Sequence, residues 1–327
     1  MELKSQLRSR GICVIIPTYN NEKSIRQVVT DTLNYCDDVI VVNDGSTDRT
    51  TATLHEMGGI TLVSYSQNKG KGCALREGFR KALSMGFAYA ITLDADGQHY
   101  PADIALFLKA NQEHPGALII GRRLLEGAVR SKGSNFANKF SNFWFYVQTG
   151  KALEDTQTGY RLYPLHKLSG LGLLTSRYEA ELELLVFASW HGVELVSIPV
   201  NVYYPPREER VSHFRPGKDF ARISVLNTVL CFLAVVYGLP LRLGRKLMVF
   251  LRTLYSLLFF LFFTMVVFTP AAWLYLKIGN VTEKKRYRLH QLIYHASRFV
   301  MIHHGIPGTK FRYQVKEKTD FDKPRVI

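Results

Sequence analysis

The chain has 327 residues, of which 47% are hydrophobic and 21% charged, so it is long enough for one large domain with further elements and too apolar to be disordered. Its formal net charge of +15 at pH 7 favours phosphate-bearing partners, such as a nucleotide, a nucleic acid or an anionic membrane. The four cysteines form no Cys-x-x-Cys pair, which argues against a zinc site or a disulfide framework and predicts thiols in a reducing compartment.

The N-terminal part of the chain alternates short apolar runs with segments of helical periodicity. Its first ten residues are polar and basic, so we expect no signal peptide. Predicted strands lie at residues 12–16, 38–43, 60–65, 89–93 and 117–120. Predicted helices lie at residues 21–34 and 71–83, and another begins at Pro101. This alternation predicts an α/β fold, with a mostly parallel sheet covered by helices on both faces.

Polar clusters follow three of these predicted strands directly. They lie at residues 18–20, 44–46 and 94–96. In parallel sheets, ligands bind beyond the carboxyl ends of the strands. We therefore expect the three clusters to meet at one binding site. No Gly-x-Gly-x-x-Gly or Walker lysine motif is present, so a dinucleotide site or a P-loop lacks its signature.

The segment after the strand at residues 89–93 reads Asp94-Ala95-Asp96-Gly97-Gln98. In an extended chain, residues i, i+2 and i+4 point the same way, so Asp94, Asp96 and Gln98 can converge on one point. Such oxygen ligands suit a Mg²⁺ or Mn²⁺ ion that also holds a phosphate. An acidic turn is the alternative, since Asp320 and Asp322 repeat the spacing in a polar tail with no strand before it.

The composition changes after residue 222. Residues 223–241 are mostly apolar, and residues 254–276 are uncharged and strongly apolar, which is long enough to span a bilayer. Residues 277–327 form a basic tail. We therefore predict a catalytic domain at 1–222, membrane-associated helices at 223–276 and a tail at 277–327. A buried core helix is the alternative for either segment, and one of them could instead lie in the membrane interface.

Six short motifs occur in the N-terminal part in a characteristic order. They read Ile16-Pro17-Thr18-Tyr19-Asn20, Val42-Asn43-Asp44-Gly45-Ser46-Thr47-Asp48, Asn68-Lys69-Gly70-Lys71-Gly72, Asp94-Ala95-Asp96-Gly97-Gln98-His99, Gly121-Arg122-Arg123 and Asp155-Thr156-Gln157-Thr158-Gly159-Tyr160-Arg161. In these motifs residues 1–222 resemble the family 2 glycosyltransferases. The similarity is to the branch that transfers mannose or glucose to dolichol or polyprenyl phosphate. The resemblance implies the GT-A (Rossmann-like) fold, followed here by C-terminal membrane helices.

The resemblance also implies a nucleotide-sugar site that takes a UDP- or GDP-sugar. Pro17, Tyr19 and Glu22 would line the pocket for the base. Asp44 would hold the base or the ribose through charge-assisted hydrogen bonds, and Lys71 would approach the nucleotide. For the lysine, as for the other basic residues, solvated surface charge is the alternative.

The same resemblance implies a metal-dependent transfer that inverts the anomeric configuration. Asp94, Asp96 and Gln98 would hold the Mg²⁺ or Mn²⁺ ion on the diphosphate, and Arg123 would contact a donor or acceptor phosphate. A lipid phosphate acceptor is already ionised and needs no strong base, whereas a hydroxyl acceptor does. Asp155 is the positional candidate for that base.

Two further regions carry candidate side chains. On a predicted helix at residues 178–190, Glu179, Glu181 and Glu183 are alternative bases, or they form an exposed acidic face. The basic segment at residues 207–222 suits a clamp for the acceptor phosphate at the membrane surface, and the resemblance implies that Arg215 or Lys218 is its phosphate ligand. A plain basic membrane anchor is the alternative for that segment.

The predicted function is transfer of one sugar from a nucleotide sugar to a membrane lipid, most simply polyprenyl phosphate. Transfer to a glycolipid hydroxyl and a non-catalytic membrane adaptor that keeps the fold are the alternatives. We expect a membrane protein with its catalytic domain on the cytoplasmic side. Nucleic acid is not an expected partner, because the basic clusters flank apolar segments and no known binding module is present. The tail faintly resembles the lead-in of membrane acyltransferases but has no His-x-x-x-x-Asp motif.

Overall fold

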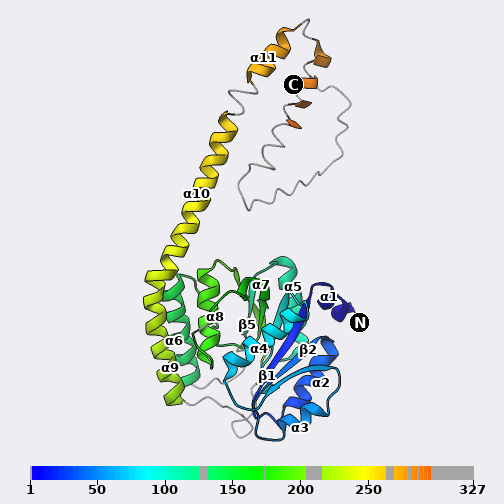
Figure 1. Cartoon of the computed structure of the whole chain (residues 1–327), viewed down its shortest axis with the longest axis vertical. Coiled ribbons are helices and arrows are strands. Elements are labelled where there is room, and N and C mark those ends of the chain that lie inside the picture. The colour runs from blue at the N-terminus through cyan, green and yellow to red at the C-terminus, as the bar shows by residue number, and fades with distance from the viewer. Residues whose placement is uncertain are drawn as a thin grey trace. The chain divides into compact units, whose positions relative to one another are not determined.

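The structure is a computed structural model that describes residues 2–124, 132–172, 174–203, 216–262, 269–278, 282–285, 287–289, 291–292 and 294–295. Its contacts divide the chain into two units, Met1–Arg242 and Leu243–Ile327, each of which is considered by itself. The first unit contains the sheet and the helices that cover it (Figure 1).

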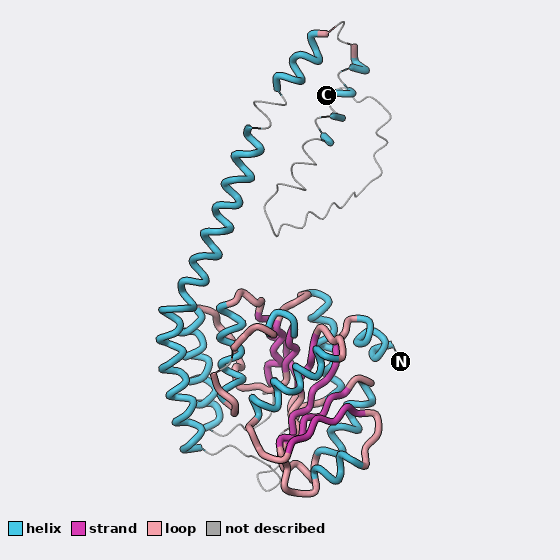
Figure 2. Tube along the Cα trace, viewed as in Figure 1, coloured by secondary structure: helices cyan, strands magenta, loops and turns pink. Residues whose placement is uncertain are grey.

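Seven strands form one sheet, in the spatial order β3-β2-β1-β4-β6-β5-β7. Along the chain they are β1 (Ile12–Thr18), β2 (Val39–Asp44), β3 (Ile60–Tyr65), β4 (Tyr89–Thr92), β5 (Leu118–Arg123), β6 (Arg161–Pro164) and β7 (Leu195–Val200). All neighbours pair in parallel except β6, which runs antiparallel to both β4 and β5. The predicted mostly parallel α/β fold is therefore confirmed (Figure 2).

Helices cover both faces of this sheet. One face carries α1 (Glu2–Ser9), α2 (Ile25–Tyr35), α3 (Thr50–His55), η1 (Pro101–Asp103) and α5 (Ile104–Glu113). The other carries α4 (Lys71–Ser84), α6 (Lys132–Thr149), α7 (Leu165–Leu168), α8 (Glu179–Trp190) and α9 (Pro216–Leu233). The helical chain continues through η3 (Ala234–Gly238) and α10 (Leu239–Phe262), and α11 spans Thr269–Lys277.

The alternation of side chains along β1 explains the two cores. Cys13 and Ile15 belong to the core under α4 and α8, whereas Val14 and Ile16 belong to the core under α2 and α5. Successive strand residues point to opposite faces, so a strand covered on both sides must be apolar at every position. All seven residues of β1 are buried accordingly.

The first apolar segment behaves differently from a free membrane helix. Along α9, Leu226 and Leu230 are buried in the core that α6 and α8 share with the sheet. Gln148 of α6 donates a hydrogen bond to the side-chain oxygen of Asn227 at 2.9 Å. This polar pair explains an asparagine within an apolar stretch. Because α9 packs here, the compact unit extends to Arg242, whereas composition changes after residue 222.

The reversed direction of β6 matters for the site. The carboxyl ends of β1, β2, β4 and β5 lie at one edge of the sheet, and an antiparallel strand has its beginning at that edge. Arg161, the first residue of β6, pairs with Thr92, the last residue of β4. The segment that leads into β6 therefore reaches the edge where the predicted polar clusters lie.

Candidate functional site

Hydrogen bonds hold the loops after β1 and β2 against each other. The backbone N–H of Asn20 donates to the hydroxyl of Ser46 at 3.0 Å, and that of Thr47 donates to the side-chain oxygen of Asn20 at 2.8 Å. Asn20 has a φ of 52°, in the left-handed region that asparagine tolerates. The Ser24 hydroxyl donates to the Ala95 carbonyl at 2.6 Å, which adds the third cluster. The three clusters therefore meet, as the sequence predicted.

The residues expected around the nucleotide base lie at this edge of the sheet and differ in their burial. Pro17 is buried inside β1, where it pairs with Val42. Tyr19 is half-buried on the following loop. The exposed Glu22 accepts a hydrogen bond from the backbone N–H of Arg49 at 3.1 Å. Of the three, Tyr19 and Glu22 are therefore on the loop and open to solvent, and their contact with a base stays a prediction.

Asp44 fixes the turn that precedes α4. Its two carboxylate oxygens accept hydrogen bonds from the backbone N–H groups of Lys69 and Gly70, at 2.7 and 2.8 Å. The residue is 3% exposed. Such bonds to a carboxylate are strong and short. Asp44 thus positions the Asn68–Gly72 turn in this structure, which is a role that the sequence did not indicate; its binding to a base or ribose stays a prediction.

Lys71 lies between two carboxylates. Its ammonium nitrogen is 2.7 Å from Asp94 Oδ1 and 3.0 Å from Glu181 Oε2. Burial alone would lower the pKa of Lys71, but the two carboxylates outweigh it and raise that pKa. Lys71 is therefore a charged, largely buried group beside the predicted metal ligands, and the surface-charge alternative is wrong for it.

Asp94 and Asp96 are electrostatically distinct although they are two residues apart. For Asp94, burial is outweighed by Lys71 and other nearby cations, so its pKa is lowered. For Asp96, burial and then the charge of Asp94 raise the pKa to about 6. Asp96 Oδ1 also accepts the backbone N–H of Gln98 at 3.0 Å, which closes a short turn. The surroundings of Asp96 therefore lack the positive charge that would balance its ionised carboxylate.

The donor set fits a hard divalent cation in one respect and departs from a preformed site in another. Asp96 has the excess negative charge that a cation would balance. However, Lys71 holds Asp94 Oδ1, and no group of three or more His, Cys, Asp or Glu side chains in the described ranges could hold a metal ion. His99, next to Gln98, is buried, which lowers its pKa to about 4 and keeps its ring neutral.

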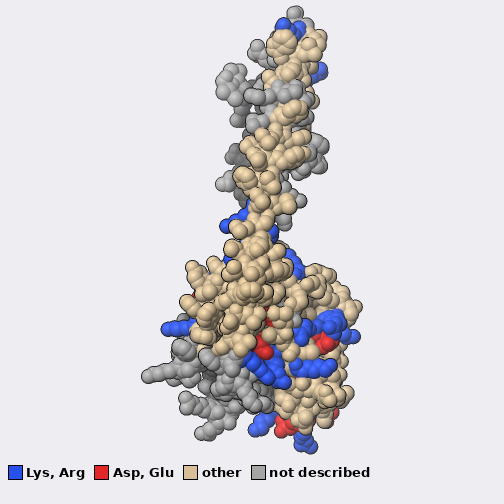
Figure 3. All heavy atoms as spheres, turned by 60° about the vertical axis from the view of Figure 1, so that its left-hand side comes forward, with Lys and Arg blue, Asp and Glu red and all other residues tan. Residues whose placement is uncertain are grey.

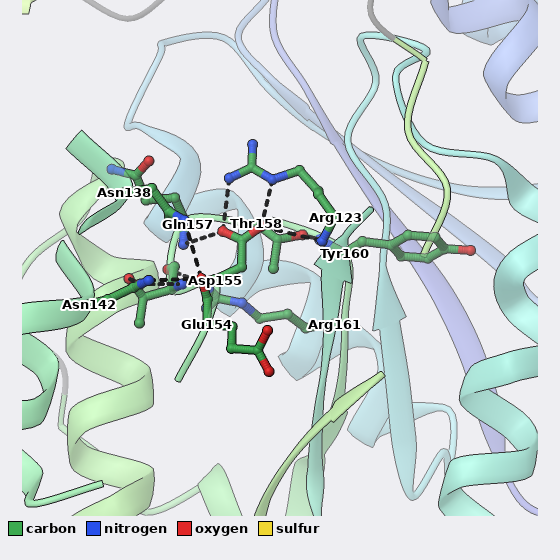
Figure 4. Close-up of polar contacts among 10 residues, drawn as sticks. Arg123, Asn138, Asn142, Glu154, Asp155, Gln157, Thr158, Tyr160 and Arg161 are labelled. Atoms are coloured by element: carbon green, nitrogen blue, oxygen red, sulfur yellow. Dashed lines mark hydrogen bonds and ion pairs between the residues drawn. The ribbon is translucent and has the colours of Figure 1, made fainter. Parts of the chain in front are cut away.

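Arg123 and Asp155 form a two-pronged ion pair. The guanidinium donates Nε–H and Nη2–H to the two carboxylate oxygens, at 2.7 and 2.8 Å. Figure 4 shows the guanidinium of Arg123 facing the carboxylate of Asp155, with dashed lines between them. The side chain of Asp155 is 4% exposed and that of Arg123 is 16% exposed. The structure thus brings together two predicted catalytic residues, but as partners of each other.

The segment that contains Asp155 is anchored on several sides. The Asn142 amide donates to the Glu154 carbonyl at 2.7 Å, and its oxygen accepts the backbone N–H of Thr156 at 3.0 Å (Figure 4). Arg161 is fully buried and donates to the carbonyls of Thr156 and Glu181, at 2.8 and 2.9 Å. This guanidinium joins the segment to the first turn of α8. Nothing in the spacing of the sequence singled out Arg161 for this role.

Gly159 lies directly against Asp94. A Cβ atom at position 159 would be 2.5 Å from Asp94 Oδ2 and 2.7 Å from Oδ1. Only glycine allows the carboxylate to lie here. The sequence displayed Gly159 within a motif, but the close approach depends on the antiparallel β6, which the sequence did not predict.

The three glutamates of α8 are buried, so the alternative of an exposed acidic face is wrong. Glu181 binds Lys71, as described above. Glu183 is fully buried and accepts hydrogen bonds from the backbone N–H groups of Leu174 and Thr175 and from the Thr175 hydroxyl. Glu179 is 8% exposed. Tertiary partners, which periodicity does not reveal, give Glu181 and Glu183 their positions.

Two predicted residues cannot be placed. Arg215 lies outside the described residues, and Lys218 lies in α9 with only its backbone described. The basic tail lies mostly outside the described residues as well. The contacts of Arg215 and Lys218 with an acceptor phosphate stay predictions.

The N-terminal part of the chain is similar to known glycosyltransferases. A sequence profile described as glycosyl transferase family 2 matches residues 13–160, which include β1 to β5 and the Asp155 segment. A UDP-N-acetylglucosamine–dolichyl-phosphate N-acetylglucosaminyltransferase of Methanococcus voltae is 30% identical over 216 residues, covering 59% of this chain and 86% of the relative. A polyprenol monophosphomannose synthase of Mycolicibacterium smegmatis is 29% identical over 215 residues, covering 61% and 79%.

Solved structures show the same fold. Glucosyl-3-phosphoglycerate synthase from Mycobacterium tuberculosis, in complex with Mn²⁺, UDP and phosphoglyceric acid, superposes with a TM-score of 0.55 at 19% identity. The match covers 71% of this chain and 81% of that one. It confirms the GT-A fold predicted from the motifs. Together with the archaeal relative and the matching profile, it leads to the conclusion that the chain is a glycosyltransferase and belongs to glycosyl transferase family 2.

Proposed function

We propose that the protein transfers a single sugar from a nucleotide-sugar donor to a polyprenyl-type lipid phosphate, with a divalent metal ion and with inversion at the anomeric carbon. The observation that carries this proposal is the convergence of Asp94 and Asp96 with Lys71 and the Arg123–Asp155 pair at one sheet edge. The relatives supply the acceptor class, since they include a dolichyl-phosphate N-acetylglucosaminyltransferase and a polyprenol monophosphomannose synthase.

Asp96 would be the principal ligand of Mg²⁺ or Mn²⁺, with Asp94 and Gln98 beside it. When bound, such an ion neutralises the charge that builds on the departing nucleoside diphosphate. Mn²⁺ and Mg²⁺ occur together with UDP in the mycobacterial synthase structures. Beside Asp94, Lys71 and Arg161 supply positive charge.

The state of Asp155 favours a phosphate acceptor over a hydroxyl acceptor. Both carboxylate oxygens of Asp155 accept hydrogen bonds from Arg123, which leaves them little capacity to take a proton. A lipid phosphate oxygen is already negatively charged at pH 7 and attacks without a base. Asp155 would then orient Arg123 toward a phosphate rather than act as the base, and Arg215 would be a further contact to the acceptor.

An assay with defined components tests this function. Purified full-length protein with Mn²⁺, a labelled UDP- or GDP-sugar and polyprenyl phosphate in mixed micelles is expected to form labelled lipid that resists mild base and is cleaved by mild acid. A panel of both nucleotides identifies the donor. Labelled product with a glycolipid acceptor alone would instead support transfer to a hydroxyl. Donor binding without turnover on any lipid would support a non-catalytic adaptor and contradict the proposal.

The outer face of α9 and the residues after it support a membrane contact. Val225 and Phe232 of α9 and Val235 of the following η3 are each about two thirds exposed, although the opposite face of α9 is buried. Figure 3 shows a largely uncharged strip along this part of the molecule. Within the described residues, one helical run, Arg222–Phe259, is long and apolar enough to cross a membrane by length and composition. We therefore propose that α9 rests its exposed face on lipid while its other face holds the catalytic unit.

An environment-sensitive probe at position 232 tests this contact. In a background with Cys73→Ser and Cys231→Ser, the variant Phe232→Cys labelled with a nitrobenzoxadiazole dye is expected to show a blue-shifted, brighter emission on lipid vesicles, because the dye enters an apolar medium. The matched control is Leu106→Cys on α5, which is also partly exposed but belongs to the opposite face of the sheet. Equal response at both positions, or none at 232, would contradict the contact. The cytoplasmic side stays a prediction from the cysteines.

A further inference from the structure

The ammonium group of Lys71 lies where it competes with a metal ion for Asp94. Its nitrogen is 2.7 Å from Asp94 Oδ1, and the Asp94 side chain is only 26% exposed. A divalent cation bound to Asp96 and Asp94 would stand within a few ångströms of this ammonium group, in a poorly hydrated site where like charges repel strongly. The metal-free site is therefore partly neutralised by the chain itself.

The position of Lys71 is imposed by the fold. Lys71 is the first residue of α4, and the turn before it is held by Asp44 through Lys69 and Gly70. The next residue, Gly72, lies so close to Ala180 that a Cβ atom would clash with the alanine side chain. Glu181 follows Ala180 directly. The crossing of the first turns of α4 and α8 thus places the ammonium group and the Glu181 carboxylate side by side.

Glu181 is a second ionic partner for Lys71. Its Oε2 binds the ammonium at 3.0 Å, while its buried Oε1 has no hydrogen-bond partner among the described residues. If Asp94 turned to a metal ion, Lys71 could remain paired with Glu181 and use that free oxygen. The ammonium would then stay charge-balanced and next to the position of the diphosphate.

We infer that Lys71 is a positioning residue that occupies Asp94 in the empty site and passes to Glu181 when a metal ion enters together with a diphosphate. This inference rests on the proposed function, because it assigns the metal to Asp94 and Asp96. Its consequence is coupled binding. The metal ion alone binds weakly, and it binds well when the negative charge of a diphosphate offsets the ammonium group. The competing cation thereby links the metal to the donor substrate.

Binding of Mn²⁺ without nucleotide tests the inference directly. Free Mn²⁺ is measured by electron paramagnetic resonance in titrations of the full chain. Lys71→Met is expected to bind Mn²⁺ about tenfold more tightly than the wild type or better, because a competing charge is removed. Glu181→Gln is expected to bind Mn²⁺ more weakly, because Lys71 then has Asp94 as its remaining carboxylate. These opposite directions distinguish competition from general damage to the site.

Two controls accompany these variants. Lys69→Met removes an exposed lysine two residues away, which lies over the Tyr65 ring rather than at Asp94, and should bind Mn²⁺ like the wild type. Lys71→Arg keeps the positive charge and should not tighten binding. Circular dichroism and the thermal melting of each variant report its folding. Mn²⁺ is expected to raise the melting temperature of Lys71→Met more than that of the wild type.

The outcomes separate this inference from the proposed function. Unchanged or weaker Mn²⁺ binding by a folded Lys71→Met overturns the inference, and the metal site itself survives if Asp96→Ala still abolishes Mn²⁺ binding. Mn²⁺ binding that Asp96→Ala does not alter, in either the wild-type or the Lys71→Met background, overturns the metal assignment and with it both proposals. Saturating UDP or GDP should raise the Mn²⁺ affinity of the wild type more than that of Lys71→Met; an equal rise in both contradicts the coupling.

Discussion

Asp96→Ala is expected to lower the rate of sugar transfer by roughly a thousandfold or more, since a lost metal ligand removes several kcal/mol of charge stabilisation from the transition state. The protein should stay folded. At pH 7 the raised pKa of Asp96 means that its ionised carboxylate destabilises the metal-free fold, because a proton binds more tightly in the folded than in the unfolded chain. The metal-free variant should therefore melt at the wild-type temperature or above it.

The measurement is the initial rate of labelled lipid formation at saturating Mn²⁺. Melting curves of the metal-free proteins are recorded in the presence of a metal chelator. Asp37→Ala is the matched control, because Asp37 is half-exposed and pairs with Lys4 on the surface. It should retain wild-type activity. Activity of Asp96→Ala within a few-fold of the wild type would defeat the assignment. A large fall in its melting temperature would show a structural role instead.

Gly159→Ala is expected to reduce transfer by about a hundredfold, because a misplacement of the order of 1 Å at a reacting site has effects of that size. The new methyl group would overlap the Asp94 carboxylate, with its carbon 2.5 Å from Oδ2, so the carboxylate must move. The overlap is with a side chain, and position 159 has no positive φ that would strain alanine. The effect on folding should therefore be smaller than the effect on activity.

Gly170→Ala provides the control, because a Cβ atom there would meet nothing within 4 Å and its φ is also unstrained. Rates and melting temperatures of the two variants are compared with the wild type. Mn²⁺ binding should be altered by Gly159→Ala alone. Full activity of that variant would mean that the Asp94 position is unimportant. If both variants unfold, the loss of activity reflects a general need for glycine in these segments and not the overlap with Asp94.

The sequence predicted the parallel strands β1 to β5 but neither the parallel β7 nor the antiparallel β6. β1, β2 and β4 were predictable because they are covered on both faces. β1, β2 and β4 are short apolar runs that end in polar clusters, and their positions follow from that pattern. β6 was missed for an equally physical reason. It has four residues, begins with the fully buried Arg161 and ends with Pro164. A buried arginine that donates to the carbonyls of Thr156 and Glu181 cannot be distinguished from a surface arginine in sequence.

The sequence predicted which residues belong to the site better than it predicted the contacts between them. The sequence indicated that Asp94, Asp96 and Lys71 belong together, and the fold brings them to one edge. It did not show that Arg123 takes both oxygens of Asp155, or that Asp44 is engaged with Lys69 and Gly70. These contacts join residues 25 to 32 positions apart, and they depend on loop paths that periodicity leaves undetermined.

The reversed β6 gives the fold a modular character. Because β5 ends and β6 begins at the same edge, the stretch between Arg123 and Arg161 departs from the reaction centre and returns to it. Changes of length or sequence in that excursion leave the register of β1, β2 and β4 intact. Evolution can therefore remodel much of the neighbourhood in which we place the acceptor while the strands beside Asp44 and Asp94 keep their register, so relatives with one fold can diverge in the lipid or small molecule that receives the sugar.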